Sequence, residues 1–186
     1  EANKFEGKSI FYHVKDKEKF ENKNISIFGG GDSALDWALE LSKRSKITLI
    51  HRRSEFRGAP HTLSEIKKLE KSGKIKIKTP CQLNSIRGDK ILESLEIKYD
   101  DGKKEIIKTN LILSFFGLIM KLGPIAEWGL NMDKKTIKVN TDNFETNKPG
   151  IFAVGDICSY PGKLRLILSG FHEVALASVE CFKRAR

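Results

Sequence analysis

The sequence lacks several features that would assign it to a specialised class of protein. No apolar run approaches the ~18–20 residues of a bilayer-spanning helix, and the first ten residues lack the hydrophobic stretch of a secretory signal. Its three cysteines, Cys81, Cys158 and Cys181, form neither a CxxC pair nor a metal-ligand cluster, so we expect reduced, buried thiols. The sequence therefore predicts a soluble, cytoplasmic protein with no membrane partner and no metal site.

What is present is a globular composition with an excess of positive charge. Hydrophobic residues make up 39% of the 186 and charged residues 31%, as in chains that bury a core. The net charge of +10 favours an acidic partner or an anionic ligand through long-range attraction. The lysines are spread along the whole chain instead of forming a compact stripe with interleaved aromatics, so we expect no nucleic-acid partner.

A strand, a glycine-rich turn and a helix follow one another in the first quarter of the chain. The apolar run 24–28 ends at three glycines, which is typical of a buried parallel strand before a tight turn. Over 32–44 apolar residues recur at helical spacing, and a second apolar strand covers 47–50. A right-handed crossover would place these two strands side by side in a parallel sheet.

The rest of the chain extends this α/β pattern. Two alternating runs flank Asp100, Asp101 and Gly102, a strong hairpin signal, so we expect an antiparallel insertion in the parallel sheet. After residue 117 the elements are too few to enclose a core of their own. The further predicted elements are a helix over 62–72, strands over 74–78, 95–99, 105–108, 111–116, 137–139 and 151–154, and a helix over 170–184.

The glycine-rich turn has the spacing of a dinucleotide-binding site. Gly29, Gly31 and Ala34 match G-x-G-x-x-A, in which the first glycine allows the sharp turn and the second lets the backbone approach a pyrophosphate. The small third residue lets the helix pack closely on the strand, and the helix N-terminus offers N–H groups to the phosphates. The predicted cofactor contacts of this turn are Gly29, Gly30, Gly31, Asp32, Ser33 and Ala34.

The end of the second strand predicts which dinucleotide is bound. An NAD site would place Asp or Glu there, whereas this chain has His51, Arg52 and Arg53, with Arg57 further along the loop. Because guanidinium groups bind a phosphate through paired hydrogen bonds, this cluster predicts NADP(H). Alternatively, the arginines are solvated loop charges and His51 is a strand-end residue hydrogen-bonded to backbone.

Three stretches resemble the thioredoxin-reductase-like group of two-domain flavoproteins. They are GGGDSALDWAL, TLIHRRSEFR, and GIFAVGD followed by PGKLRLILSGFHEVALAS, in order along essentially the whole chain. The resemblance implies a Rossmann-like NADPH-binding domain over 1–116 and the C-terminal portion of a second, FAD-binding Rossmann-like domain over 117–186. In that family the NADPH domain is inserted into the FAD domain. We therefore expect a fragment that lacks the N-terminal FAD half and holds FAD weakly or not at all.

The resemblance also implies flavin contacts in the C-terminal part. Gly155 and Asp156 would contact the ribityl and pyrophosphate region, unless they form an ordinary strand-ending turn. Lys163 and Leu164 lie where the family's backbone reaches the pyrimidine end of the flavin. Gly117, at the crossing between the two domains, is also counted among the cofactor contacts.

One stretch separates this chain from thioredoxin reductases proper, which carry a redox-active CxxC shortly before the glycine-rich strand. Here the stretch reads GKSIFYHV, which with GGDSALDWA and YPGKL resembles ferredoxin:NADP reductases of thioredoxin-reductase-like architecture. The implied activity is electron transfer between NADPH and ferredoxin, or another acidic electron-transfer protein, through FAD, by a homodimer when full length and with no catalytic side chain. The alternatives are a related NADPH reductase with a different acceptor and an isolated NADP(H)-binding regulatory module.

Overall fold

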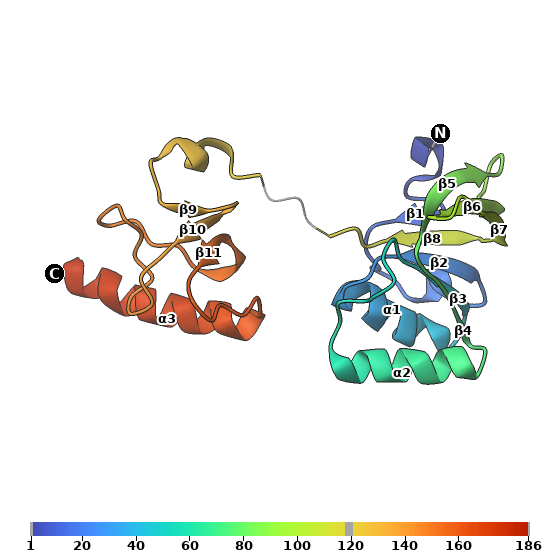
Figure 1. Ribbon diagram of the computed structural model, residues 1–186, viewed down its shortest axis with the longest axis horizontal. Helices are drawn as coiled ribbons and strands as arrows, with labels where there is room; N and C mark the ends of the chain where they lie inside the picture. Colours follow the sequence, from blue (N-terminus) through green and yellow to red (C-terminus); the bar gives the residue numbers. More distant parts are fainter. Residues whose placement is uncertain (1, 118–120, 186) are drawn as a thin grey trace. The chain divides into compact units, whose positions relative to one another are not determined.

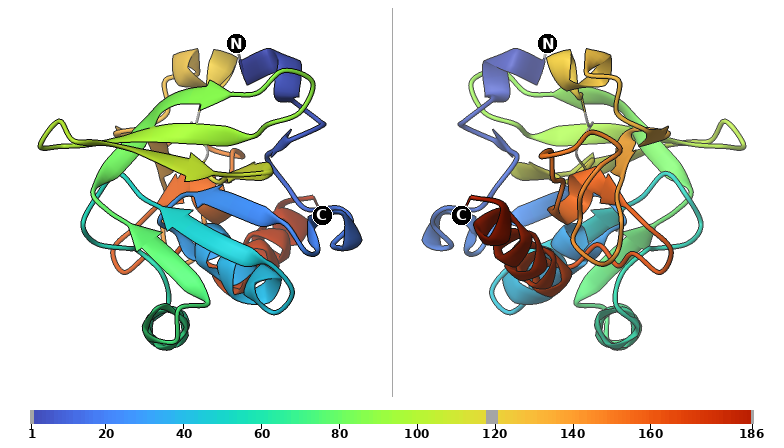
Figure 2. Two further views of the ribbon diagram at one scale, coloured as in Figure 1. Left: turned by 90° about the vertical axis from the view of Figure 1, so that its right-hand side faces the viewer. Right: turned by 90° about the vertical axis from the view of Figure 1, so that its left-hand side faces the viewer.

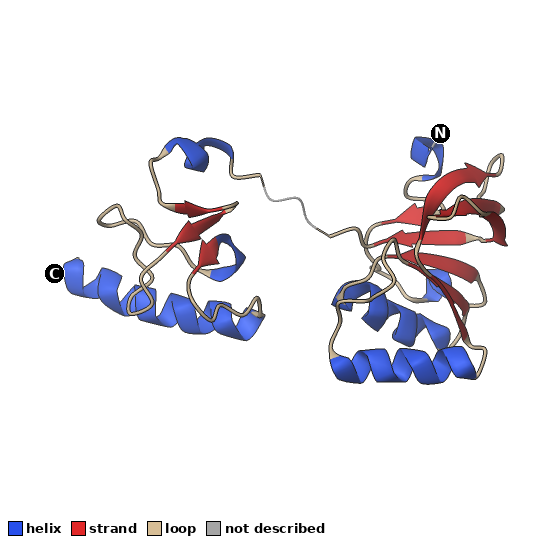
Figure 3. Ribbon diagram, in the orientation of Figure 1, coloured by secondary structure: helices blue, strands red, loops and turns tan. Residues whose placement is uncertain are grey.

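The computed structural model describes residues 2–117 and 121–185, which belong to two compact units (Figure 1). The first unit extends to residue 118 and the second begins at residue 119. The first unit carries most of the strands, whereas a single long helix dominates the second (Figure 3). Within the described residues, no helix combines the length and the apolar character needed to cross a membrane.

The first unit is built on a five-stranded parallel sheet in the order β1-β8-β2-β3-β4. The parallel pairing predicted for the strands on either side of the glycine turn is confirmed, since Ile25 lies opposite Ile47. Four of the strands were predicted to within one or two residues at each end. The strands are β1 (Ile10–Phe11), β2 (Asn24–Phe28), β3 (Lys46–Ile50), β4 (Ile75–Lys78) and β8 (Leu111–Ser114).

Both faces of this sheet are covered (Figure 2). Helices α1 (Asp32–Ser42) and α2 (Pro60–Lys71) pack on one face, against residues such as Ile27 and Leu49. The neighbouring residues Phe28 and Ile50 point the other way, as alternation along a strand requires, and join a second core with Leu95 of the antiparallel insertion. Alternate residues of β2 and β3 thus fill two separate cores.

The insertion is a three-stranded antiparallel sheet of β5 (Cys81–Arg87), β6 (Ser94–Tyr99) and β7 (Lys104–Lys108). The predicted hairpin is confirmed: β6 pairs with β7, and Gly102 takes the left-handed conformation, with φ +88°, in the turn between them. Strand β5 was not predicted, because its sequence, CQLNSIR, does not alternate cleanly between apolar and polar residues.

The second unit has short strands and one long helix. Its three strands form a sheet in the order β11-β10-β9. Leu130, Ile137, Ala153 and Cys158 form a small buried core in this unit, so the expectation that these elements would enclose no core was wrong. The strand predicted over 151–154 is also wrong, because Phe152 forms only an isolated bridge with Glu145. The elements are β9 (Met132–Asp133), β10 (Thr136–Lys138), β11 (Cys158–Ser159) and α3 (Ile167–Arg184).

Helix α3 exposes a row of large apolar side chains. It begins at Ile167, three residues earlier than predicted, and this extra turn carries Leu168, which is 78% exposed. Cys181 also lies exposed on α3, so the expectation that it is buried was wrong, whereas Cys81 and Cys158 are buried. We define the apolar face of α3 as Ile167, Leu168, Phe171, Val174 and Val179.

Short 3-10 helices complete both units. In the described residues they are η1 (Ala2–Phe5), η2 (Glu18–Phe20), η3 (Gly123–Glu127) and η4 (Gly155–Ile157). The last of these directly follows Val154, so the GIFAVGD motif ends in a helical turn and not in a strand.

Candidate functional site

The glycine turn joins the carboxyl end of β2 to the first residue of α1. A Cβ on Gly29 would lie 2.7 Å from the carbonyl oxygen of Phe115 and 2.8 Å from the Cβ of Ala34. Only glycine fits there, and its φ of +152° also disfavours other residues. Ala34 is fully buried, so the close packing of helix on strand that the motif implies is present.

The N-terminus of α1 faces open space. Gly31 is the N-cap, and no side chain in the described ranges caps the helix. A Cβ on Gly31 would meet nothing within 4 Å, and Asp32 and Ser33 are exposed. The first N–H groups of α1 are therefore accessible to an anion, which is the environment that a dinucleotide pyrophosphate requires.

The loop after β3 is hydrogen-bonded to the glycine turn. The N–H of Arg57 donates to the carbonyl of Gly30 at 2.6 Å, and Arg57 forms a parallel bridge with Gly31. The N–H of Ala59 donates to Oδ1 of Asp32 at 2.9 Å. The structure therefore brings the predicted phosphate-binding turn and the predicted arginine loop together.

His51 packs inside this arrangement. Its ring stacks on Phe56 with centroids 5.4 Å apart, and a Cβ on Gly30 would lie 2.3 Å from its ring atoms. Burial, followed by the charges of Arg53 and Arg52, holds the pKa of His51 below its usual 6.5, although a hydrogen bond with the Glu55 backbone opposes the shift. Its Nε2 is buried without a partner among the described residues. The geometry thus favours a neutral packing residue over a cationic phosphate ligand.

The three arginines of the loop are exposed. Arg52, Arg53 and Arg57 have no ion pair with any residue that the structure describes. Their guanidinium groups therefore carry uncompensated positive charge beside the glycine turn. A phosphate bound there would face up to three donors of the kind that form paired hydrogen bonds.

The residues predicted to contact a flavin lie in the second unit. Gly155 begins η4 with a φ of +76°, and Asp156 beside it is exposed. Leu164 is also exposed, but the Lys163 side chain is only 9% exposed and forms an ion pair with Glu173. Sequence reasoning missed Glu173, for which the available signal was an acidic residue within the mainly apolar first half of α3.

Gly117 is in the first unit, after β8, with a φ of +83°, and nothing in the described chain would contact a Cβ added there.

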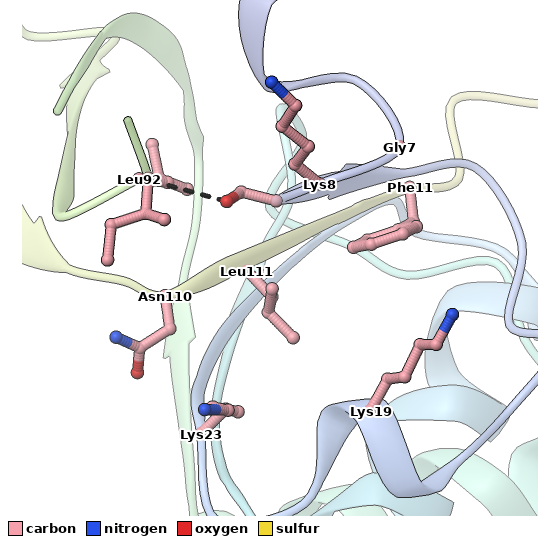
Figure 4. A pocket seen from close by; sticks show the side chains of 10 residues that line it. Gly7, Lys8, Phe11, Lys19, Lys23, Leu92, Asn110 and Leu111 are labelled. Atoms are coloured by element: carbon pink, nitrogen blue, oxygen red, sulfur yellow. Dashed lines mark hydrogen bonds between the residues drawn. The ribbon is translucent and has the colours of Figure 1, made fainter. Parts of the chain in front are cut away.

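A cavity of about 440 Å³ opens elsewhere in the first unit (Figure 4). Its lining includes Lys19, Lys23, Phe11 and Leu111. Lys23 and Leu111 lie at the amino ends of β2 and β8, whereas the glycine turn follows the carboxyl end of β2. The cavity is therefore at the opposite edge of the parallel sheet and is not part of the candidate nucleotide site.

The described residues contain no group of three or more His, Cys, Asp or Glu side chains placed to hold a metal ion.

Comparisons with known proteins give one consistent result. The sequence model of the family described as "Pyridine nucleotide-disulphide oxidoreductase" matches residues 3–177. A "Ferredoxin--NADP reductase" of Pelagibacter ubique is 65% identical over 186 residues, which are 100% of this chain and 55% of that protein. The same name is given to an Orientia tsutsugamushi (strain Ikeda) protein that is 48% identical over 182 residues, 97% of this chain and 54% of that protein.

Among solved structures, the fold matches thioredoxin reductase of Lactococcus lactis in its FR conformation, with a TM-score of 0.82 and 28% identity. That match covers 97% of this chain and 59% of the other. The chain thus spans little more than half the length of the curated relatives that it matches.

Proposed function

We propose that this chain, which belongs to the pyridine nucleotide-disulphide oxidoreductase family, carries the NADP(H) site of a flavoprotein reductase. The reductase would transfer electrons between NADPH and ferredoxin. The observation that carries the proposal is the exposed arginine loop hydrogen-bonded to the glycine turn. The name of the relatives that are 48–65% identical supports ferredoxin as the acceptor. We assign residues 1–116 to the NADPH domain and 117–186 to part of the FAD domain, a boundary two residues before the division between the two compact units.

The residues of the first unit fit NADPH by the chemistry of their donors. The N–H groups of Gly31, Asp32 and Ser33 would receive the pyrophosphate, and Arg52, Arg53 and Arg57 the 2′-phosphate. His51 would hold the loop in place without charge. Bound NADPH supplies a hydride, and the protein's part is to bind and orient it, so no side chain need act as acid or base.

The second unit fits part of a flavin site. Asp156 presents an exposed carboxylate that can accept a hydrogen bond from a ribityl hydroxyl, and Gly155 leaves open space beside it. The apolar face of α3 supports a partial domain, since exposed apolar rows of this kind usually pack against further chain. The relatives are long enough to supply that chain.

The cysteines argue against a disulfide acceptor. All three are free, and burial raises the pKa of the Cys81 thiol to about 11 and also raises that of Cys158. Cys81 and Cys158 therefore carry little of the reactive thiolate at neutral pH, and the exposed Cys181 has no second cysteine on its helix. An acidic electron-transfer protein suits the net charge of +10 better than a dithiol does. The homodimer remains a prediction from the resemblance.

The test is nucleotide binding by calorimetry with the wild-type chain, Arg52→Ala and Arg53→Ala. Hydrogen bonds to charged groups contribute about 1.5–3 kcal/mol, so each variant should bind NADPH roughly 10–100-fold more weakly and NADH unchanged. Arg87→Ala, which removes an exposed arginine from β5, is the matched control and should bind both nucleotides like the wild type. Equal affinity of the wild type for NADPH and NADH would overturn the assignment.

A further inference from the structure

Helix α3 buries one carboxylate completely. Glu173 is 0% exposed, although α3 exposes much of its remaining surface. Four polar groups surround the carboxylate, and they come from residues 155–163, which run from the start of η4 to the loop before α3. They are the N–H of Gly155, the thiol of Cys158, the hydroxyl of Tyr160 and the ammonium of Lys163. We call these five residues the Glu173 cluster.

The two carboxylate oxygens have different partners. Oε2 accepts the N–H of Gly155 at 2.6 Å. Oε1 accepts the hydroxyl of Tyr160 at 2.8 Å and the ammonium of Lys163. The Cys158 thiol has one hydrogen, and its shorter contact is with the carbonyl of Gly155 at 3.2 Å, compared with 3.5 Å to Oε2. Donors therefore approach both oxygens of Glu173 at once.

A carboxylate in this position stays ionised because of its partners. Burial alone would raise the pKa of Glu173, but Lys163, Gly155 and Tyr160 together hold it below its usual value. Burial would lower the pKa of Lys163, and Glu173 more than offsets it. A buried charge costs several kcal/mol unless it is paired and hydrogen-bonded, and here both conditions are met.

The helix lies close to the turn that it contacts. A Cβ on Gly170 would lie 3.7 Å from the Cα of Gly155, so α3 comes closest to the turn at a position where the helix itself has a glycine. One helical turn further along, Glu173 binds the N–H of Gly155, whose φ is +76°. Asp156, the next residue, is held exposed.

We infer that Glu173 is a positioning residue, which fixes the Gly155–Asp156 turn and the Lys163 segment through hydrogen bonds to both of its oxygens. The inference rests on the proposed function only in assigning flavin contact to this turn. Neither Lys163 nor Glu173 is available to a ligand, because the two side chains form an ion pair with each other. Asp156 is the member of this region whose carboxylate points to solvent.

The decisive variant is Glu173→Gln, because glutamine has the same shape but only one acceptor oxygen. The Lys163 ammonium will take that oxygen, and the Gly155 N–H will then face an NH₂ group that cannot accept its proton. Amide hydrogen exchange of the 186-residue chain, measured by NMR, should be at least tenfold faster at Gly155 relative to Ala153. The N–H of Ala153 binds the carbonyl of Phe144 at 3.0 Å in the same unit and reports general loosening.

A second substitution should reverse this effect. In Lys163→Met combined with Glu173→Gln the ammonium is gone, and the Tyr160 hydroxyl can rotate to accept from the glutamine NH₂. The glutamine oxygen can then turn to Gly155, so the exchange ratio should return to within about threefold of the wild type. Glu180→Gln, two helical turns further along the same face and paired with Arg184 instead of the turn, is the control and should leave the ratio unchanged.

Equal acceleration at Gly155 and Ala153 would overturn the proposal, because Glu173 would then only stabilise the unit as a whole. If the Glu173→Gln chain does not fold, an experiment on the wild-type chain still tests the positioning role of Glu173. Its Gly155 amide resonance should shift with the acid titration of Glu173 while that of Ala153 does not. An unmoved Gly155 resonance would refute the role.

The link to flavin is tested separately, in a protein extended to the length of the relatives. Glu173→Gln should raise the flavin dissociation constant at least tenfold and leave NADPH affinity unchanged. If the unsubstituted long protein binds no flavin, the proposed function fails while the exchange experiment still decides the positioning role. If it binds flavin and Glu173→Gln binds it equally well, the turn is not the flavin contact that we infer.

Discussion

The two units bury their apolar surfaces in different ways. The first covers both faces of its parallel sheet, one with α1 and α2 and the other with the antiparallel insertion. The second has strands of two or three residues, a small core, and a long helix whose apolar face is exposed. The first unit therefore closes its own core, whereas the second combines a small core with a buried ionised carboxylate, Glu173, and leaves an apolar surface exposed.

The largest difference between the units should come from replacing a leucine by alanine in each of them separately. Leu49→Ala, at a fully buried position of β3, should lower the free energy of unfolding of the first unit by about 2–5 kcal/mol, since it leaves a cavity. Leu168→Ala, on the apolar face of α3, should change stability by less than about 0.5 kcal/mol. Urea unfolding followed by Trp37 reports the first unit and by Trp128 the second.

Single-tryptophan variants, Trp37→Phe and Trp128→Phe, separate the two signals. If Leu168→Ala destabilises the second unit as strongly as Leu49→Ala destabilises the first, the apolar face of α3 is covered in solution and the contrast between the units is lost.

A smaller effect should appear within the glycine turn. Gly30→Ala would place a Cβ 2.3 Å from the His51 ring, so it should cost about 1–3 kcal/mol of stability by overpacking and weaken NADPH binding. Gly31→Ala has open space and an extended backbone, so it should cost only about 0.5–1 kcal/mol, the usual preference for glycine over alanine at an N-cap. It should nonetheless weaken NADPH binding, because the methyl group enters the space in front of α1.

Denaturant unfolding and calorimetric titration of both alanine variants measure this difference. Unchanged NADPH affinity in Gly31→Ala would place the nucleotide away from the helix N-terminus.

The smallest effect should be a difference in acid sensitivity between the units. The pKa of Glu173 is lower in the folded chain than its usual 4.5, so its stabilising contribution is complete above pH 4.5 and is lost as the pH falls below it. In the first unit the pKa values of Glu40, Glu65, Glu96 and Glu105 are also lowered by neighbouring lysines, but these lysine side chains are partly or largely exposed, so water screens the interactions.

Thermal unfolding from pH 6 to pH 3 should therefore shift the Trp128 transition to lower temperature by several degrees more than the Trp37 transition. Glu173→Gln should abolish the extra shift. An equal shift in both transitions would mean that the buried pair has no special share in the stability of the second unit.

Much of the first unit could be predicted from the sequence because its signals are local. The apolar runs of β2 and β3, the glycines between them and the spacing along α1 each depend on neighbouring residues. Strand β5 could not be predicted in this way, since its pairing with β6 and not its own pattern makes it a strand.

The site was less predictable where it depends on tertiary contacts. The sequence identifies the arginines as a group but cannot show that the Arg57 N–H binds Gly30, because this contact joins residues on two different loops. Glu173 is a stronger case, since its partners lie 10 to 18 residues away along the chain. The predicted burial of Cys181 was wrong because helical spacing does not reveal which face of α3 another element covers.

The hydrogen bonds between the Arg57 loop and the glycine turn have a kinetic consequence. The two elements that we propose to contact the phosphates are held together by hydrogen bonds within the protein itself, so binding need not restrict a freely moving backbone. The entropic penalty of association is then limited mainly to the exposed arginine side chains. Nucleotide association should accordingly be a single fast phase whose rate rises in proportion to nucleotide concentration, with no slow rearrangement after encounter.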